Sequence, residues 1–241
     1  MDLTSAAFWL ALGQIIWINI ILSGDNAVVI ALAARSLPPK QQKQAVLYGS
    51  GAAVVLRIVL TLVAAYLLTL PYLQIVGGLL LLWIGVQLLG EEDGGEGESK
   101  TNASMLVAVR TILIADLVMS LDNVIAVALA SKIDGVVNYP LLIIGLAISI
   151  PLVIFGSTLM IKLMERFPII VVLGACLIGW VAGDAMTHDE AVKSLFAGNP
   201  MAAYGIKIAG AVFVLLVGKW LAARATRGHP EGVPVEQKTG G

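Results

Sequence analysis

The sequence is short of charged residues, aromatic residues and cysteine, and each shortage narrows the choice of fold and function. Only 13% of its 241 residues are charged and 6% are aromatic. Lys and Arg number 15 against 16 Asp and Glu, so the formal net charge is −1 and no basic surface suggests a nucleic acid as partner. Cys176 is the single cysteine, which excludes an internal disulfide and any metal site built from several cysteines.

Apolar residues, in contrast, are abundant and come in long runs. They make up 59% of the chain, and the mean hydropathy is +0.92. A helix needs about 20 apolar residues to cross the hydrocarbon core of a bilayer. Seven stretches have this character: 8–34, 46–68, 72–90, 105–130, 140–161, 168–187 and 203–222. Since lipid offers no partner to unpaired backbone groups, the sequence predicts an all-α membrane protein with seven transmembrane helices.

The placement of Lys and Arg predicts the orientation in the membrane. The N-terminal stretch has no positively charged region like that of a cleaved signal peptide, so we expect the first helix to be retained. Eleven Lys and Arg residues follow helices one, three, five and seven, and only Lys132, Lys193 and Lys207 would lie on the opposite side. We therefore expect the N-terminus outside and the C-terminus inside the cell.

The chain contains an internal repeat without gaps. Adding 97 to Ser23, Asp25 and Asn26 gives a second serine, aspartate and asparagine. These pairs are Ser23 with Ser120, Asp25 with Asp122 and Asn26 with Asn123. The same shift matches Asn19 with Asp116, Pro71 with Pro168, Gly77 with Gly174 and Trp83 with Trp180. Because each copy has an odd number of helices, the second enters the membrane from the opposite side, which predicts two inverted halves.

This repeat divides the chain into five parts. Residues 1–90 form the first three-helix repeat and 105–187 the second, joined by an acidic, Gly-rich cytoplasmic linker at 91–104. Residues 188–222 hold the seventh helix and its preceding loop, and 223–241 are expected to be a disordered cytoplasmic tail. Asp189 and Glu190, in the loop before the seventh helix, are expected to be solvated.

Several charged residues interrupt the predicted helices. They are Asp25, Arg57, Asp116, Asp122 and Asp184. A charged residue at the bilayer centre costs roughly 2.5–3.5 kcal/mol, so four aspartates would cost on the order of 10 kcal/mol unless neutralised. If all ionise, one arginine leaves three negative charges uncompensated. A divalent cation would remove two of them, and one shared proton the last.

The spacing of the neutral polar residues suggests a common site. Asn19, Ser23 and Asn26 form one helical stripe, and Asp116, Ser120 and Asn123 form another. Asp25 and Asp122 lie about 100° from these stripes in a continuous helix. Local unwinding at "SGDN", with Gly24 permitting unusual dihedral angles, would bring Asp and Asn together. The second copy has Leu121 in place of Gly24, which makes a break there less expected.

The candidate ligands are all oxygen atoms, which favour Mg, Ca or Mn over Zn or Cu. Met119 is either a soft ligand that favours Mn or a packing residue. Each buried asparagine alone is as consistent with hydrogen bonding between helices as with metal binding. Arg57 is either structural, paired with one aspartate, or part of the transport step. The repeated pair of Asp25 and Asp122 favours a functional site over packing.

The motifs "SGDN" and "SLDN", with "GLAISIPLVIFGSTL" and "GWVAGDAM", resemble those of the TerC family of integral membrane proteins over about residues 8–222. The resemblance implies two inverted three-helix units, as in LysE-type transporters. It also implies roles in manganese export, in supplying manganese to exported proteins, or in tellurium resistance. The metal-site residues implied by motif match are Asp25, Asn26, Asp116, Asp122, Asn123 and Asp184. Asn19 departs from the family pattern, where an acid is expected.

The leading hypothesis is therefore a transporter that exports a divalent cation, with Mn²⁺ as the first candidate, across the bacterial cytoplasmic membrane. It would work by alternating access and exchange the cation for protons. No prosthetic group is expected. The alternative is a membrane scaffold that delivers metal to exported proteins or partners the secretion machinery without a flux of its own. An intramembrane aspartyl protease is disfavoured, because Val181-Ala182-Gly183 precedes Asp184 where such proteases carry Gly-x-Gly.

Overall fold

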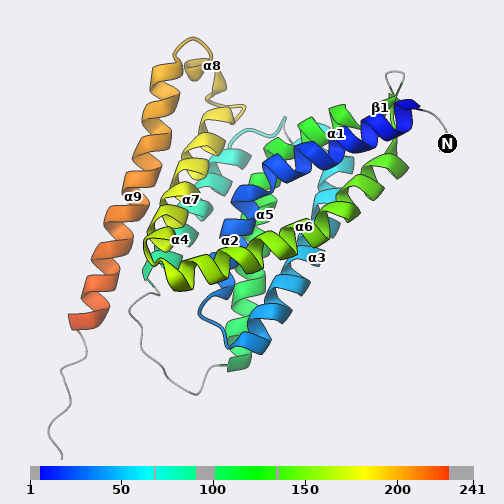
Figure 1. The fold of residues 1–241 in the computed structure, drawn as a ribbon. Coiled ribbons are helices and arrows are strands. Elements are labelled where there is room, and N and C mark those ends of the chain that lie inside the picture. Colours follow the sequence, from blue (N-terminus) through cyan, green and yellow to red (C-terminus); the bar gives the residue numbers. More distant parts are fainter. Residues whose placement is uncertain (1–5, 68, 91–100, 134–135, 228–241) are drawn as a thin grey trace, which may run out of the picture.

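The computed structural model describes residues 6–67, 69–90, 101–133 and 136–227, and for a few of these, Asp122 among them, only the backbone. Long helices dominate this part of the chain (Figure 1). The first half contains α1 (Ala6–Leu22), α2 (Gly24–Ala34), α3 (Pro39–Leu67) and α4 (Leu73–Gly90). The predicted first span, 8–34, is therefore two helices, and α3 begins earlier than the predicted 46.

The second half begins with α5 (Thr101–Ala130), which is followed by the short strands β1 (Lys132–Ile133) and β2 (Val136–Val137). The two strands pair antiparallel, with Ile133 opposite Val136. The helices α6 (Tyr139–Arg166) and α7 (Ile169–His188), the short α8 (Lys193–Phe196) and the long α9 (Pro200–Arg227) complete the chain. Neither the hairpin nor α8 was predicted. Since α9 extends to Arg227, the first five residues of the predicted disordered tail are helical, and the others lie outside the described residues.

Among the described residues, five helices qualify as membrane spans by length and composition, and α1 and α2 together qualify as a bent sixth. The predicted fourth span, 105–130, is not among them; it coincides with α5, a helix of 30 residues in which several side chains lie outside the described part of the chain. Large apolar side chains point outward along the helices, for example Trp17 at 64% and Phe155 at 70% exposure. A soluble domain does not expose so many, so the outer surface fits lipid. The chain is a multi-pass membrane protein.

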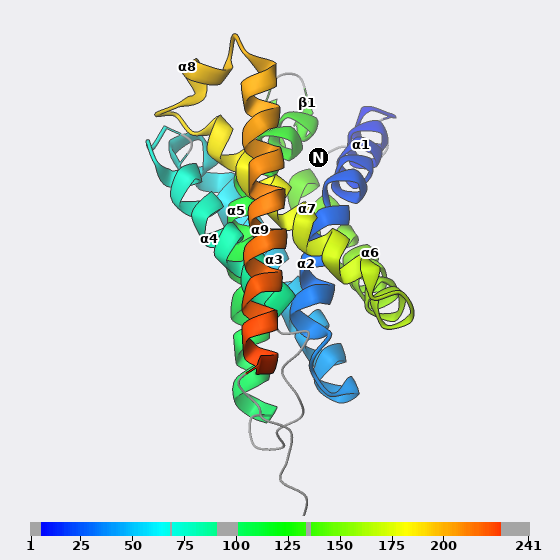
Figure 2. The same ribbon diagram turned by 90° about the vertical axis from the view of Figure 1, so that its left-hand side faces the viewer.

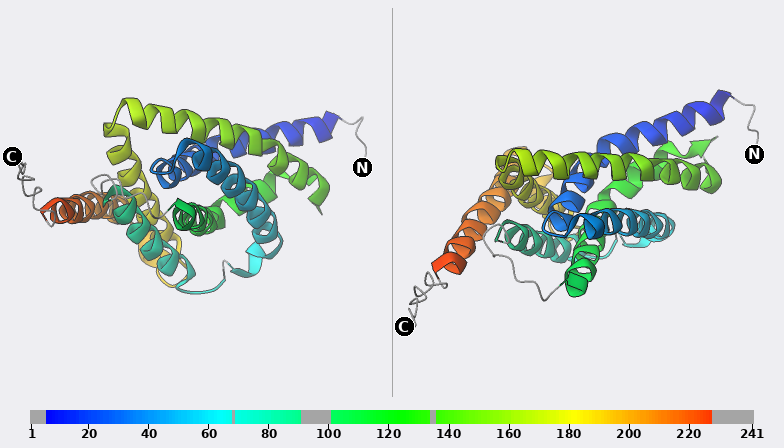
Figure 3. Two further views of the ribbon diagram at one scale, coloured as in Figure 1. Left: turned by 90° about the horizontal axis from the view of Figure 1, so that it is seen from below. Right: turned by 60° about the horizontal axis from the view of Figure 1, so that its bottom comes forward.

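The internal repeat of the sequence returns in the helix boundaries. Adding 97 to the bounds of α4 gives 170–187, and α7 spans 169–188. The same shift moves α3 to 136–164, where α6 spans 139–166. The halves also exchange partners, because α3 packs mainly on α5 of the second half, and α6 packs on α1 and α2 of the first. Figure 3 shows α6 lying along α1 and α2. The two copies therefore interlock.

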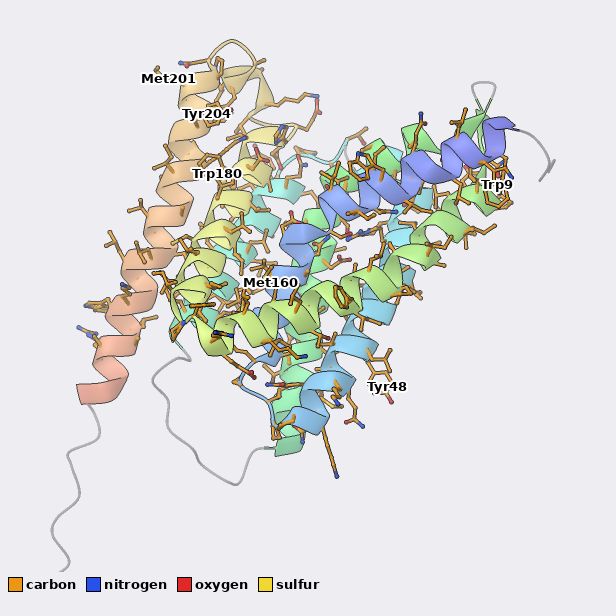
Figure 4. The ribbon with its side chains drawn as sticks, viewed as in Figure 1. Trp9, Tyr48, Met160, Trp180, Met201 and Tyr204 are labelled. Atoms are coloured by element: carbon orange, nitrogen blue, oxygen red, sulfur yellow. The ribbon has the colours of Figure 1, made fainter. Side chains whose placement is uncertain are left out.

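The helix α9, which has no counterpart in the repeat, packs along α7 and α4 (Figure 2). Glycines allow α7 and α9 to approach closely. A Cβ atom placed on Gly179 or Gly210 would collide with the backbone of the other helix, and one on Gly183 would lie 2.7 Å from the Ile206 carbonyl oxygen. Trp180 of α7 and Tyr204 of α9 lie side by side at the end of this contact nearer to α8 (Figure 4), with 6.1 Å between their ring centroids.

Candidate functional site

The first membrane span is broken at the repeated polar motif. Its two helices, α1 and α2, meet at 47°, and the single residue between them is Ser23. The predicted break at "SGDN" is therefore present, as a bend and not as an unwound segment, and its predicted cause, unusual dihedral angles at Gly24, is wrong. Ser23 has φ −101° and ψ −3°, whereas the φ of Gly24 lies outside the left-handed region that only glycine enters easily. The second copy stays helical through Leu121, as that residue suggested.

The break buries polar groups that have no partner among the described residues. Asn19, Ser23 and Asn26 are at most 6% exposed. Both amide atoms of Asn19, the hydroxyl of Ser23 and Oδ1 of Asn26 lack a hydrogen bond there. An unsatisfied buried polar group costs about 1–3 kcal/mol. Such a cluster is therefore expensive to bury, and its oxygen atoms are of the type that coordinates hard cations.

Asn26 makes two hydrogen bonds to its neighbours in the chain at the break. Its backbone N–H donates to Oδ1 of Asp25 at 2.7 Å, and its side-chain amide donates to the Leu22 carbonyl at 3.2 Å. The regular helical ladder resumes with the Ala27 N–H and the Ser23 carbonyl at 2.9 Å. Asp25 thus lies in the first turn of α2, where the helix dipole favours a negative charge. It also interacts electrostatically with Arg57 and Asp116, so these residues share one neighbourhood.

A buried triad connects the two halves beside this break. Arg57 of α3 donates through Nη2 to Oδ1 of Asp116 on α5 at 2.6 Å, and through Nε to the Ser120 hydroxyl at 3.0 Å. Ser120 in turn donates to Oδ2 of Asp116 at 3.1 Å. The exposed fractions are 4% for Arg57, 5% for Asp116 and 0% for Ser120. Of the roles considered for Arg57, pairing with an aspartate is the one that this structure contains.

The helix α6, which packs along the broken span, contains two buried serines that were not predicted. Gly145 of α6 packs on Ile15 of α1, and Gly156 packs on Ala27 of α2, so α6 runs beside the broken span in the same direction. Ser149 and Ser157 repeat at intervals of four from Gly145 and are 2% and 0% exposed. Each donates to a carbonyl of its own helix, which leaves oxygen lone pairs for other partners. Gly145, Ser149 and Ser157 lie at multiples of four residues with Val153 between the serines, which is too weak a pattern to have identified them in advance.

The other predicted site residues lie elsewhere or are only partly described. The side chain of Asp122 lies outside the described residues, and Asn123 follows it in α5, partly buried. Asp184 of α7 pairs with Lys207 of α9 at 2.5 Å, next to His188. No contact described for Asp184 joins it to Asp25 or Asp116. The structure therefore brings together Asn19, Ser23, Asp25 and Asn26 with Arg57, Asp116 and Ser120.

Asp189 corrects the expectation of a solvated loop residue. Its side chain is fully buried and accepts hydrogen bonds from the backbone N–H groups of Tyr72, Gln74 and Ile75, at 2.9, 2.9 and 3.2 Å. The N–H of Ala191 donates as well, at 2.9 Å. Burial raises the pKa of Asp189, but these four donors outweigh it and hold the pKa below its usual value. Asp189 thus caps the start of α4 from the far end of the chain.

The donor set at the break suits a hard cation. Among the described residues, no three His, Cys, Asp or Glu side chains gather closely enough to hold a metal ion. The groups that do gather are two carboxylates with amide and hydroxyl oxygens. Oxygen ligands of this kind favour Mg, Ca and Mn over softer metals.

These features define a multi-pass membrane protein with a polar centre around a broken helix. A family model described as "Integral membrane protein TerC family" matches residues 4–226. The chain therefore belongs to the TerC family of integral membrane proteins, and the resemblance seen in its motifs is confirmed.

Curated relatives are themselves membrane proteins. The chain is 41% identical over 209 residues to "Uncharacterized membrane protein YjbE" of Bacillus subtilis, which covers 87% of this chain and 94% of that protein. It is 29% identical over 191 residues to "UPF0053 inner membrane protein YoaE" of Escherichia coli, covering 71% of this chain but 36% of the relative. It is 26% identical over 219 residues to "Uncharacterized membrane protein YceF" of Bacillus subtilis, covering 86% and 83%. No solved structure gives a significant match.

Proposed function

We propose that this protein transports a divalent metal cation, Mn²⁺ in the first place, out of the cell across the bacterial cytoplasmic membrane. The observation that carries the proposal is the set of oxygen atoms on Asn19, Ser23 and Asn26, at the break in the first span, that have no hydrogen-bond partner among the described residues. A protein keeps costly unsatisfied groups in its interior where they have a use, and binding a cation satisfies all three. The proposal involves no catalytic step and no prosthetic group.

The charge of this centre supports a divalent guest. Asp25 and Asp116 contribute two negative charges and Arg57 one positive charge. The repeat assigns Asp122 to the same centre as the counterpart of Asp25, which brings the sum to −2 when all three aspartates are ionised. One divalent ion would neutralise that sum. Protonation of a carboxylate would weaken the cage again, which provides a route to coupling with protons.

The interlocked halves support alternating access. In the inverted arrangement that the odd number of helices per repeat predicts, the first helices of both copies meet near the membrane midplane. The broken span α1–α2 packs against α5, its counterpart in the second copy. Rocking one half against the other would expose the centre to each side in turn. Location in the cytoplasmic membrane is supported by the name of YoaE, an inner membrane protein.

The test is Mn²⁺ flux in sealed vesicles that contain the purified protein. Asp25→Asn and Asp122→Asn are expected to abolish most of the flux, since each removes a charge from the cage. Glu190→Gln is the matched control, because Glu190 is exposed and pairs with Lys193 far from the break. Parental flux in both aspartate variants would refute the proposal. Binding of Mn²⁺ without any flux in the parent would instead favour the metal-delivering scaffold.

A further inference from the structure

We infer that Arg57 is a built-in counter-ion that occupies Asp116 while the centre is empty and must leave it when the metal cation binds. The inference depends on the proposed function and adds a competitor to the same site. Without such a competitor, an aspartate deep in the membrane would be an uncompensated charge after each release of the ion. Arg57 would remove that penalty in the empty state.

Two donors of the protein already hold the carboxylate of Asp116. Arg57 holds Oδ1 of its carboxylate at 2.6 Å, and Ser120 donates to Oδ2 at 3.1 Å. Both oxygens of Asp116 thus accept a hydrogen bond. The oxygens of Asn19, Ser23 and Asn26, in contrast, accept none from the described residues. Each carboxylate oxygen keeps a second lone pair, so a metal ion that used Asp116 as a ligand would lie beside the guanidinium, and the two positive charges would repel each other. A cation would therefore meet competing donors at the carboxylate of Asp116 but not at the neutral oxygens.

The electrostatics favour displacement of Arg57 over coexistence. Arg57 and Asp116 are both nearly fully buried, so their interaction is only weakly screened. Asp25 interacts electrostatically with both of them, so a cation bound by Asp25 would also act on the guanidinium. A divalent ion there attracts Asp116 with twice the charge of Arg57 and repels the guanidinium. When all three aspartates are ionised, exchange of Arg57 for a divalent ion changes the net charge of the centre from −2 to −1.

The triad also spans the two halves, because Arg57 belongs to α3 and Asp116 to α5. Loss of this ion pair on metal binding would release a contact between the copies at the moment when the loaded protein has to move. Arg57 would thus couple binding of the metal ion to movement of the two halves relative to each other.

The test is calorimetric titration of Mn²⁺ into the purified full chain. Arg57→Gln is expected to bind Mn²⁺ about tenfold more tightly or better, since the competing charge is gone from a poorly screened centre. Arg57→Lys keeps the charge and should stay near the parental affinity. Arg110→Gln is the matched control, because Arg110 is exposed on the same helix as Asp116 and should change nothing. Unchanged or weaker binding in folded Arg57→Gln would overturn the inference.

A second variant keeps the test decisive if Arg57→Gln does not fold. Ser120→Ala frees Oδ2 of Asp116 and retains the charge of Arg57, so it is expected to tighten Mn²⁺ binding a few-fold. Unchanged or weaker binding in this variant would also contradict the counter-ion. Should the parental protein bind no Mn²⁺ at all, the proposed function fails, and that result is distinct from parental binding that Arg57 does not influence.

Discussion

At the residue scale, the protein holds polar side chains where lipid-facing helices normally have none, and the way each is satisfied separates structural from functional roles. Arg57, Asp116 and Ser120 satisfy one another. Asp189 is satisfied by four backbone donors. The Ser23 hydroxyl has no partner among the described residues, although it is 6% exposed. Only a group of the last kind, without a partner among the described residues, has its bonding capacity free for a ligand.

This contrast predicts opposite effects of one substitution on stability and on metal binding. Ser23→Ala removes a buried hydroxyl without a partner, so the free energy of unfolding should stay equal or rise by up to about 1 kcal/mol. Mn²⁺ affinity should fall, because one oxygen ligand is lost. Thermal unfolding and titration of the same preparation measure both quantities. Ser194→Ala, at an exposed serine of α8, should alter neither. A clear loss of stability in Ser23→Ala would mean that the hydroxyl is structural.

The residues of the site were predictable where the repeat marked them and unpredictable where the fold alone brings partners together. The duplicated motif identified Asp25 and Asn26, and it indicated Asn19 and Ser23 through helical spacing. The choice of Asp116 as partner of Arg57 came only with the packing of α3 on α5. Asp189 was missed because its donors, Tyr72 and Gln74, are more than a hundred residues away in sequence.

At the scale of the elements, the start of α4 depends on a cap from the end of α7. Tyr72, just before α4, has φ 67°, a conformation that is costly for a residue other than glycine. The hydrogen bond from its N–H to Asp189 helps to hold it there. The first N–H groups of a helix have no intrahelical partner, and a carboxylate satisfies them while it also matches the helix dipole. The loop before α4 is thereby fastened to the second half.

Asp189→Asn should destabilise the protein by about 1–2 kcal/mol, as loss of a helix cap does, and should alter its response to acid. The pKa of Asp189 in the folded protein is lowered from about 3.8. Its contribution to stability is therefore complete above pH 3.8 and is lost as the pH falls through the lower folded value. In Asp189→Asn, the part of the stability that depends on ionised Asp189 should be missing, so the variant should lose less stability than the parent when the pH is lowered. Thermal unfolding at several pH values measures it, and an unchanged profile would count against the cap.

The bend of the first span illustrates what can be predicted for an element. Two asparagines, an aspartate and a serine interrupt an apolar run, which indicated a weak point. The residue that departs from helical geometry is Ser23, while Gly24 is already in α2. Composition thus located the break within one residue but gave the wrong cause. A Cβ atom on Gly24 would meet nothing within 4 Å, so no close contact requires glycine there either.

At the scale of the whole molecule, the long apolar stretches were sufficient to predict the helices of both repeats, because membrane spans are set by length and hydropathy. The exchanged packing of the two copies was not predictable, since interfaces between apolar helices depend on shape. The close contact of α7 with α9 at Gly179 and Gly210 is an example. The small hairpin and α8 escaped prediction because their stretches are short and carry no periodic pattern.

The predicted orientation has a direct test. In a Cys176→Ser background, Lys43→Cys lies near the start of α3, just after the connection between the first two spans, and Ser194→Cys lies in α8, between the last two spans. With the N-terminus outside, a membrane-impermeant maleimide should label position 194 on intact cells and position 43 only after the membrane is opened. Labelling in the reverse order would invert the assignment and, with it, the side from which the metal enters.

The central claim is that the broken first span and its acidic neighbours hold one divalent cation. Electron paramagnetic resonance of Mn²⁺ bound to the purified protein tests it most directly, because the signal counts bound ions and reports an oxygen environment. We expect about one high-affinity ion per chain in the parent and in Glu190→Gln, and none in Asp25→Asn. Equal amounts of bound Mn²⁺ in the parent and in Asp25→Asn would contradict the account.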